Sequence, residues 1–263
     1  MSHHIIEVQD LKFAYPDKTA ALKGISFRIE HGESVAVVGA NGAGKSTLLL
    51  HLNGYLTPQE GKVRIGDYPL TRKTILEARR TVGMVFQDPD DQLFMATVFD
   101  DVAFGPLNLG LPPDEVKDRV YRALATVDIS HLSDRPPHRL SAGQKRRVAI
   151  ASVLTMSPDI LVMDEPSAGL DPRARKNLLV LLQGFKHSKI IATHDLDMVM
   201  DLCERTIVMH DGLIMADGPT REIFADDALL AESHLEKPLT MQTCPACSPP
   251  AGCHPRLRPS QKT

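Results

Sequence analysis

The chain has 263 residues, of which 43% are hydrophobic and 24% are charged, and its formal net charge is −3. This length suits one large domain or two small ones. The near balance of 30 basic and 33 acidic residues argues against a general nucleic-acid binder, which carries a basic surface. No apolar run approaches the ~18 residues that a membrane-spanning helix needs, and the N-terminus lacks the basic and apolar regions of a signal peptide. We therefore expect a soluble, intracellular protein that binds no nucleic acid.

The N-terminal region has the pattern of β structure. Residues 5–8 and 24–29 alternate apolar and polar side chains, with turn residues at 15–17 between them. Residues 34–38 then form a nearly continuous apolar run, which is typical of a strand that is covered on both faces. A glycine-rich segment follows, and after it a leucine-rich segment of helical character at residues 47–52. The order is therefore strand, glycine-rich loop and helix.

Two later apolar runs, residues 160–163 and 189–193, predict further buried strands. Helical segments separate them, the clearest at residues 173–185. Strands that alternate with helices indicate a parallel sheet of the α/β class. A long stretch rich in helix formers, about residues 88–157, lies between the first and second buried strands, and we expect it to be a helical insertion.

The composition changes after about residue 236. Residues 237–263 hold six prolines, three cysteines and four Lys or Arg, with no Asp or Glu. Such a segment buries little apolar surface, so we expect a disordered tail after a folded domain of residues 1–236. Its thiols and a histidine are soft ligands of the kind that zinc, cobalt and nickel accept, although their spacing is not that of a standard zinc finger. Incidental thiols are the alternative. The candidate tail ligands are Cys244, Cys247, Cys253 and His254.

Residues 39–47 read Gly-Ala-Asn-Gly-Ala-Gly-Lys-Ser-Thr and fit the pattern G-x-x-x-x-G-K-[ST]. Glycines let the backbone curl so that successive N–H groups point at phosphate oxygens, and a helix N-terminus favours anions. We expect Lys45 to reach the β- and γ-phosphates and the Ser46 hydroxyl to ligate Mg²⁺. Because a strand precedes the loop and a helix follows it, the pattern predicts a nucleoside triphosphate site. The expected binding residues are Gly39, Asn41, Gly42, Ala43, Gly44, Lys45, Ser46 and Thr47.

The strand at residues 160–163 delivers Asp164 and Glu165 at its carboxyl end, where ligands bind in open α/β sheets. We expect Asp164 to enter the Mg²⁺ shell and Glu165 to polarise an attacking water. Such a site is built to hydrolyse, because a nucleotide sensor needs no carboxylate for the water. His194 follows the strand at residues 189–193, from which it would reach the γ-phosphate; a structural role is the alternative.

Taken together, these motifs resemble the ATPase subunit of ABC transporters over residues 5 to about 232. Leu140-Ser-Ala-Gly-Gln144 is similar to the family's signature motif, and residues 167–171 are similar to the segment after its catalytic glutamate. The signature usually has two glycines, and Ala142 replaces the first; we expect a helical backbone there, which tolerates alanine. The resemblance implies a P-loop NTPase fold of the α/β class, with a RecA-like parallel-sheet core, an N-terminal antiparallel β subdomain and a helical insertion.

The resemblance also implies roles for single residues. Glu165 would be the catalytic glutamate and His194 the switch histidine. Gln87 would link the nucleotide site to the helical subdomain and would bind Mg²⁺ together with Ser46 and Asp164. Tyr15 would stack on adenine. The family implies a head-to-tail dimer, either of identical subunits or of two paralogues, with two ATP molecules at the interface. The residues that would face the ATP held by the other subunit are Ser141, Gly143 and Gln144.

Residues 85–94 and 101–110 resemble the energy-coupling-factor group of importers. That resemblance implies a peripheral ATPase pair on the cytoplasmic face of the cell (inner) membrane, a transmembrane coupling protein and a substrate-capturing membrane protein. The tail ligands favour cobalt or nickel as the cargo, and a vitamin is the alternative. A soluble ABC ATPase without a transport role is a further alternative, but such proteins usually have long coiled-coil insertions or two ATPase domains on one chain, and neither occurs in this sequence.

Acidic residues gather in one segment of the chain. Between Arg80 and Lys117 there are seven acids and no Lys or Arg. One interpretation is a solvated acidic face, and the other is that part of this acidic patch receives a basic cytoplasmic helix of the membrane partner. The acids are Asp88, Asp90, Asp91, Asp100, Asp101, Asp114 and Glu115.

Overall fold

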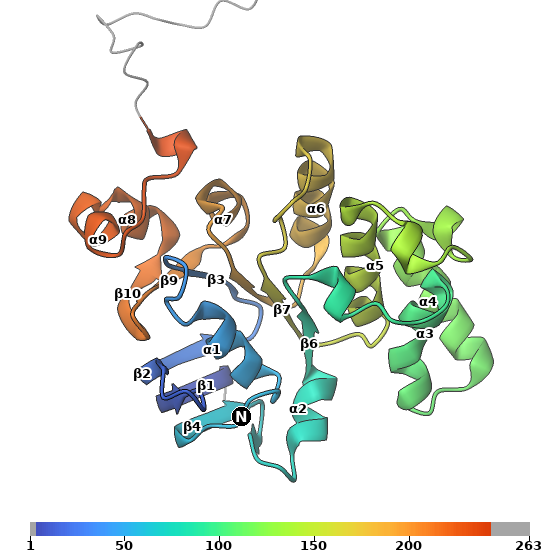
Figure 1. Cartoon of the computed structure of the whole chain (residues 1–263), viewed down its shortest axis with the longest axis horizontal. Coiled ribbons are helices and arrows are strands. Elements are labelled where there is room, and N and C mark those ends of the chain that lie inside the picture. The colour runs from blue at the N-terminus through green and yellow to red at the C-terminus, as the bar shows by residue number, and fades with distance from the viewer. Residues whose placement is uncertain (1–3, 243–263) are drawn as a thin grey trace, which may run out of the picture.

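The computed structural model describes residues 4–242, and in this part of the chain the strands form two sheets (Figure 1). In spatial order the larger sheet comprises β10 (Leu213–Pro219), β9 (Arg205–His210), β3 (Ser34–Val38), β8 (Ser188–Ala192), β7 (Ile160–Asp164) and β6 (Val82–Val85). The smaller sheet comprises β2 (Ala20–Glu30), β1 (His4–Ala14), β4 (Glu60–Ile65) and β5 (Tyr68–Pro69), and its strands pair antiparallel.

The core of the larger sheet is parallel. β3 pairs with β8 and β9, and β7 pairs with β8 and β6, all in parallel, whereas β10 runs antiparallel to β9. Every residue of β6, β7 and β8 is buried, as expected for strands covered on both faces. The predicted α/β fold with a parallel-sheet core and an N-terminal antiparallel sheet is confirmed. The carboxyl ends of these strands share one edge, where ligands bind in such sheets.

Helix α1 (Lys45–Leu52) lies between the two sheets (Figure 1). Its Leu48, Leu49 and Leu52 are fully buried in one cluster with Leu11 of β1 and Val162 of β7. Helix α2 (Ile75–Thr81) then leads into β6. Because α1 begins at Lys45 and packs against both sheets, its N-terminal end is fixed relative to the strands that carry the other candidate site residues.

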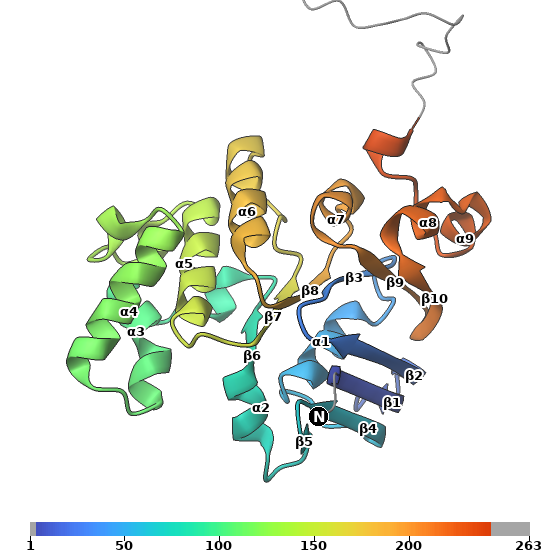
Figure 2. The same cartoon turned by 180° about the vertical axis from the view of Figure 1, so that it is seen from behind.

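Two helices, α6 (Pro172–Gly184) and α7 (Leu196–Leu202), cover the face of the larger sheet opposite α1 (Figure 2). Alternate strand residues therefore enter different cores: Val37 packs with α1, whereas the next residue, Val38, packs with Leu178 of α6 and Met198 of α7. This alternation follows from the two-residue period of side chains along a strand.

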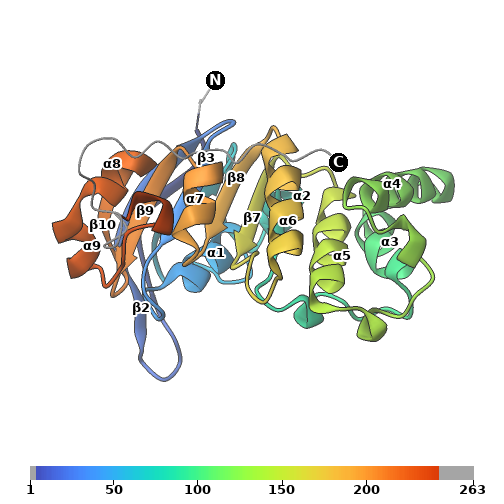
Figure 3. The same cartoon turned by 90° about the horizontal axis from the view of Figure 1, so that it is seen from above.

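The remaining helices lie at the two ends of the larger sheet (Figure 3). Helices α8 (Thr220–Ala225) and α9 (Asp227–Glu232) lie beside β10, and α3 (Val98–Asn108), α4 (Pro113–Thr126) and α5 (Ala142–Leu154) pack together beyond β6. The short 3-10 helices are η1 (Pro89–Asp91), η2 (Ser130–Leu132), η3 (Pro137–Arg139) and η4 (Leu239–Met241). Among residues 4–242, no helix combines the length and the apolar character that crossing a membrane requires.

Candidate active site

The glycine-rich loop connects the carboxyl end of β3 to the start of α1. Gly44 has φ +100°, and a Cβ on it would lie 2.6 Å from the carbonyl oxygen of Ala21. A Cβ on Gly39 would collide with the carbonyl oxygen of Met209. Both positions therefore need glycine, the first for its backbone conformation as well as for space. The neighbouring strands hold the loop in the curled form that the sequence pattern predicts.

The ammonium of Lys45 lies across this loop. Its Nζ donates hydrogen bonds to the carbonyl oxygens of Gly39, at 2.8 Å, and Ala40, at 3.1 Å. Burial lowers the pKa of Lys45, and the charges of Glu165 and Asp164 oppose that shift. A buried cation beside two carboxylates and an anion-binding loop is suited to hold phosphate oxygens.

Asp164 ends β7 and is 5% exposed. Its Oδ1 is buried without a hydrogen-bond partner among the described residues. Burial raises the pKa of this carboxyl, and a hydrogen bond from the Ser46 side chain opposes the rise. A buried oxygen that lacks a donor, next to a hydroxyl, fits Mg²⁺, which takes hard oxygen ligands and is usually held by one or two carboxylates together with waters and substrate phosphates. The residues present therefore suit the ion that the sequence pattern predicts.

Glu165 turns away from the strand with φ +44°, in the left-handed region. Its Oε2 lies 2.8 Å from Nδ1 of His194 and accepts hydrogen bonds from the Thr193 hydroxyl at 3.0 Å and from the His194 backbone N–H at 3.3 Å. The glutamate is 6% exposed, whereas the His194 side chain is 68% exposed. The two predicted catalytic residues therefore touch, with the histidine on the solvent side.

A cavity of about 610 Å³ brings most of the predicted residues together. Tyr15 is at its rim, where the phenol oxygen lies 3.0 Å from Oγ1 of Thr47 and the ring meets Phe13 edge to face. This position agrees with the predicted adenine contact, which stays a prediction. The lining residues that the sequence singled out are Tyr15, Asn41, Gly42, Gly44, Lys45, Ser46, Thr47, Gln87, Asp164, Glu165 and His194.

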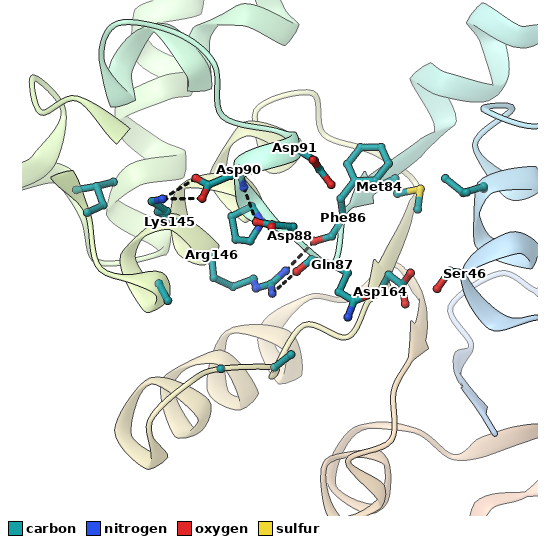
Figure 4. A pocket seen from close by; sticks show the side chains of 16 residues that line it. Ser46, Met84, Phe86, Gln87, Asp88, Asp90, Asp91, Lys145, Arg146 and Asp164 are labelled. Carbon is teal, nitrogen blue, oxygen red and sulfur yellow. Dashed lines mark hydrogen bonds and ion pairs between the residues drawn. The ribbon is translucent and has the colours of Figure 1, made fainter. Parts of the chain in front are cut away.

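Gln87 follows β6 and also lines a second cavity, of about 740 Å³, between the sheet and α5 (Figure 4). Arg146 of α5 reaches across it and donates hydrogen bonds to the carbonyl oxygens of Phe86, at 2.7 Å, and Gln87, at 2.6 Å. Beside it, Lys145 forms an ion pair with Asp90 at 2.6 Å. The first turns of α5 are therefore tied to the segment that carries Gln87. Local sequence patterns do not reveal the Arg146 contacts, because they join residues about sixty positions apart.

The sequence model of the ABC transporter family matches residues 22–168, which carry this loop, Gln87, Asp164 and Glu165. The chain belongs to the ABC transporter ATP-binding family. A Geobacter sulfurreducens protein, named provisionally as an ABC transporter ATP-binding protein, is 71% identical over 247 residues, which cover 94% of this chain and 99% of that protein. The energy-coupling factor transporter ATP-binding protein EcfA of Methanocaldococcus jannaschii is 49% identical over 240 residues, covering 89% and 86% of the two chains.

Solved structures of the family have the same fold. CbiO1 from Clostridium perfringens, part of the ABC transporter complex CbiONQ, has a TM-score of 0.77 at 44% identity, over 88% of this chain and 94% of that one. The ATP-binding cassette MJ0796, solved as a dimer bound to ADP and Pi, has a TM-score of 0.76 at 26% identity, over 82% and 99%. The chain is thus an ATPase, the ATP-binding subunit of an ABC transporter of the EcfA and CbiO type.

The ABC signature segment begins α5. Ser141 is the N-cap, and its side chain and that of Gln144 form a reciprocal capping box. Ala142 is the first helical residue, so the expected helical backbone at this position is confirmed. Neither Ser141 nor Gly143 nor Gln144 lines the cavity at the phosphate loop of the same chain. The predicted contact of these residues with ATP would need a second subunit.

The acidic segment does not form one continuous charged face. Asp101 is buried, its Oδ1 accepts hydrogen bonds from the backbone N–H groups of Phe94 and Met95 at 3.0 Å, and burial raises its pKa. Glu115 pairs with Arg119 of the same helix, at 2.8 Å. The interpretation of the seven acids as a shared surface is therefore wrong for Asp101, which organises its own loop.

Four further predicted residues, Cys244, Cys247, Cys253 and His254, lie outside the described residues. Thr193, whose hydroxyl contacts Glu165, is a further residue of the site that the sequence motifs do not include. The only sequence signal for Thr193 is its position at the end of a buried strand, directly before His194.

Proposed function

We propose that this chain hydrolyses ATP in an energy-coupling-factor importer, as a peripheral subunit on the cytoplasmic face of the cell membrane. One observation carries the enzymatic part of the proposal: Lys45, Asp164, Glu165 and His194 converge on one cavity at the carboxyl edge of the sheet. The likeness to EcfA supports the transporter type. The domain would comprise residues 1–236, with a helical subdomain at about 88–157 and a separate tail at 237–263.

In the proposed reaction, the phosphate loop and Lys45 hold the β- and γ-phosphates. Glu165 accepts a proton from a water as the water oxygen bonds to the γ-phosphorus. The bond from that phosphorus to the oxygen bridging the β-phosphate breaks, which yields ADP and phosphate. Ser46, Gln87 and Asp164 would hold Mg²⁺, which neutralises phosphate charge when it is bound. His194 would orient Glu165 and reach the γ-phosphate.

The active form is proposed to be a head-to-tail dimer, of identical subunits or of two paralogues. Its support is the position of Ser141 and Gly143 at the N-terminus of a thirteen-residue helix, away from their own chain's phosphate loop. A helix N-terminus favours anions, so the α5 of one subunit would approach the γ-phosphate held by the other. The dimeric state of the MJ0796 neighbour supports the same arrangement.

The membrane partners are proposed to be a transmembrane coupling protein and a substrate-capturing protein. Phe94 and Phe104 are exposed and meet edge to face with ring centroids 5.0 Å apart, and the exposed Leu107 lies one helical turn further along α3. The exposed acid Asp91 precedes Phe94 by three residues. An apolar patch with an acidic rim suits a basic, partly apolar cytoplasmic helix. We call these four residues the docking patch.

Phe104→Glu is expected to reduce co-purification of the coupling protein at least about tenfold, because an aromatic anchor would be lost and a carboxylate would be buried against the apolar side chains of the partner helix. Affinity purification from detergent-solubilised membranes measures the retained partner. Tyr68→Glu changes a similarly exposed aromatic on β5 of the smaller sheet and should retain the partner. If the Phe104→Glu variant retained as much coupling protein as the parent, the docking patch would not be the site where the coupling protein binds.

The proposed cargo is cobalt or nickel, and its support is the soft-ligand set of the tail. The full chain is expected to bind about one cobalt or nickel ion tightly, and the double variant Cys244→Ser, Cys247→Ser is expected to lose that binding. Isothermal titration with the metal alone measures both. Equal, weak titration curves for the two proteins would leave a vitamin as the better cargo.

A further inference from the structure

One oxygen of Glu165 is fully engaged by protein groups. Oε2 accepts hydrogen bonds from the Thr193 hydroxyl, at 3.0 Å, and from the backbone N–H of His194, at 3.3 Å. Nδ1 of the His194 ring lies 2.8 Å from the same oxygen. Among the described residues, no hydrogen bond occupies Oε1. The carboxylate is therefore held through Oε2, which leaves Oε1 available to a water molecule.

Thr193 is the most constrained of these partners. It is fully buried directly after β8, and its backbone N–H donates to the carbonyl oxygen of Val37, at 3.2 Å, on the strand that leads into the phosphate loop. Its Oγ1 accepts a hydrogen bond from the backbone N–H of Asp195 at 3.0 Å. Because that N–H engages a lone pair of Oγ1, the hydroxyl proton is directed at Glu165.

A second layer fixes this geometry. Arg175 of α6 holds the Asp195 carboxylate with two hydrogen bonds, of 2.6 and 2.8 Å. The bidentate pair fixes the backbone whose N–H orients the Thr193 hydroxyl. The side chain of His194 is 68% exposed, so Thr193 is the more firmly fixed of the two partners of Glu165.

We propose that Thr193 is a positioning residue that holds Oε2 of Glu165 and so makes Oε1 the oxygen that takes the proton from the attacking water. This proposal rests on the proposed function of Glu165 as the base. The buried hydroxyl holds the carboxylate at the oxygen that the exposed His194 also contacts. Alignment of a reacting group to within an ångström is worth about a hundredfold in rate, so a loose carboxylate would turn over slowly although ATP still bound.

Thr193→Val keeps the shape and removes the hydroxyl. In protein purified with its membrane partners, it should lower kcat for ATP about ten- to a hundredfold and leave KM within about twofold. Thr193→Ser restores the hydroxyl and should return kcat to within about threefold of the parent. Parental kcat in Thr193→Val, or equal losses in the Val and Ser variants, would overturn the proposal.

Thr206→Val is the matched control. Thr206 is also fully buried and lies on β9, on the other side of β3. Its hydroxyl forms a hydrogen bond of 2.9 Å with the Thr220 hydroxyl, which is not part of the candidate active site. Its variant should keep parental kcat even if its melting temperature falls. If Thr193→Val does not fold while Thr206→Val does, Thr193→Ser and Thr193→Cys take its place. Activity in the Ser variant but not in the Cys variant would support the role of the hydroxyl. Full activity in the Cys variant would overturn that role.

Glu165→Gln separates this inference from the proposed function. If Glu165→Gln keeps parental turnover, the assignment of the base fails and with it the role of Thr193. If Glu165→Gln is inactive while Thr193→Val is fully active, only the positioning role fails. The double variant should be no slower than Glu165→Gln alone, because the two residues would act as one unit.

Discussion

Glu165→Gln is expected to lower ATP turnover at least about a hundredfold while ATP still binds. The amide keeps the size of the side chain and its contacts with Thr193 and His194, but it does not accept the proton of the attacking water. ATP would stay intact in the site, so the variant should accumulate as an ATP-bound dimer. Phosphate release measures turnover, and sedimentation with MgATP measures assembly.

The control for this change is Glu204→Gln, which alters an exposed glutamate just before β9 and should hydrolyse ATP at the parental rate. Parental turnover in Glu165→Gln would show that another group, or the γ-phosphate itself, takes the proton.

Lys45→Ala is expected to weaken ATP binding at least about thirtyfold, because it removes the buried ammonium that would pair with the phosphate charges of ATP. Lys45 donates to the carbonyl oxygens of Gly39 and Ala40 at the mouth of the loop, so the phosphates would meet carbonyl oxygens without a cation between them. Titration with a fluorescent ATP analogue measures the affinity. Because less ATP would be bound, ATP turnover would also fall at all practical ATP concentrations.

A lysine outside the site provides the comparison. Lys62 is exposed on β4, and Lys62→Ala should bind ATP as the parent does. Unchanged affinity in Lys45→Ala, with a normal melting transition, would mean that the backbone of the loop alone carries phosphate binding.

The buried strands of the parallel sheet were predictable where the apolar run was uninterrupted. β3, β7 and β8 are runs of this kind, and each is found within a residue or two of its predicted bounds. β6 was not predicted, because its short run contains Gly83, which is a poor strand former. The glycine is there for space: a Cβ on it would collide with the side chain of Val153.

The site was predictable where chemistry follows directly from chain order. Lys45 in the loop, and Asp164 and Glu165 after a strand, come together because the carboxyl ends of parallel strands share one edge. The roles of Arg146 and Thr193 were not predictable, since each depends on contacts with a distant segment. Asp101 was misread for the same reason: its partners are backbone N–H groups that only the folded loop presents.

The role of Glu165 is tested most directly by phosphate release from this chain, purified with its membrane partners and reconstituted into vesicles, beside its Glu165→Gln counterpart. We expect ATP hydrolysis that requires Mg²⁺ in the native assembly, and at least about a hundredfold less in the variant. Equal phosphate release from both assemblies, with ATP bound equally well, would contradict this role.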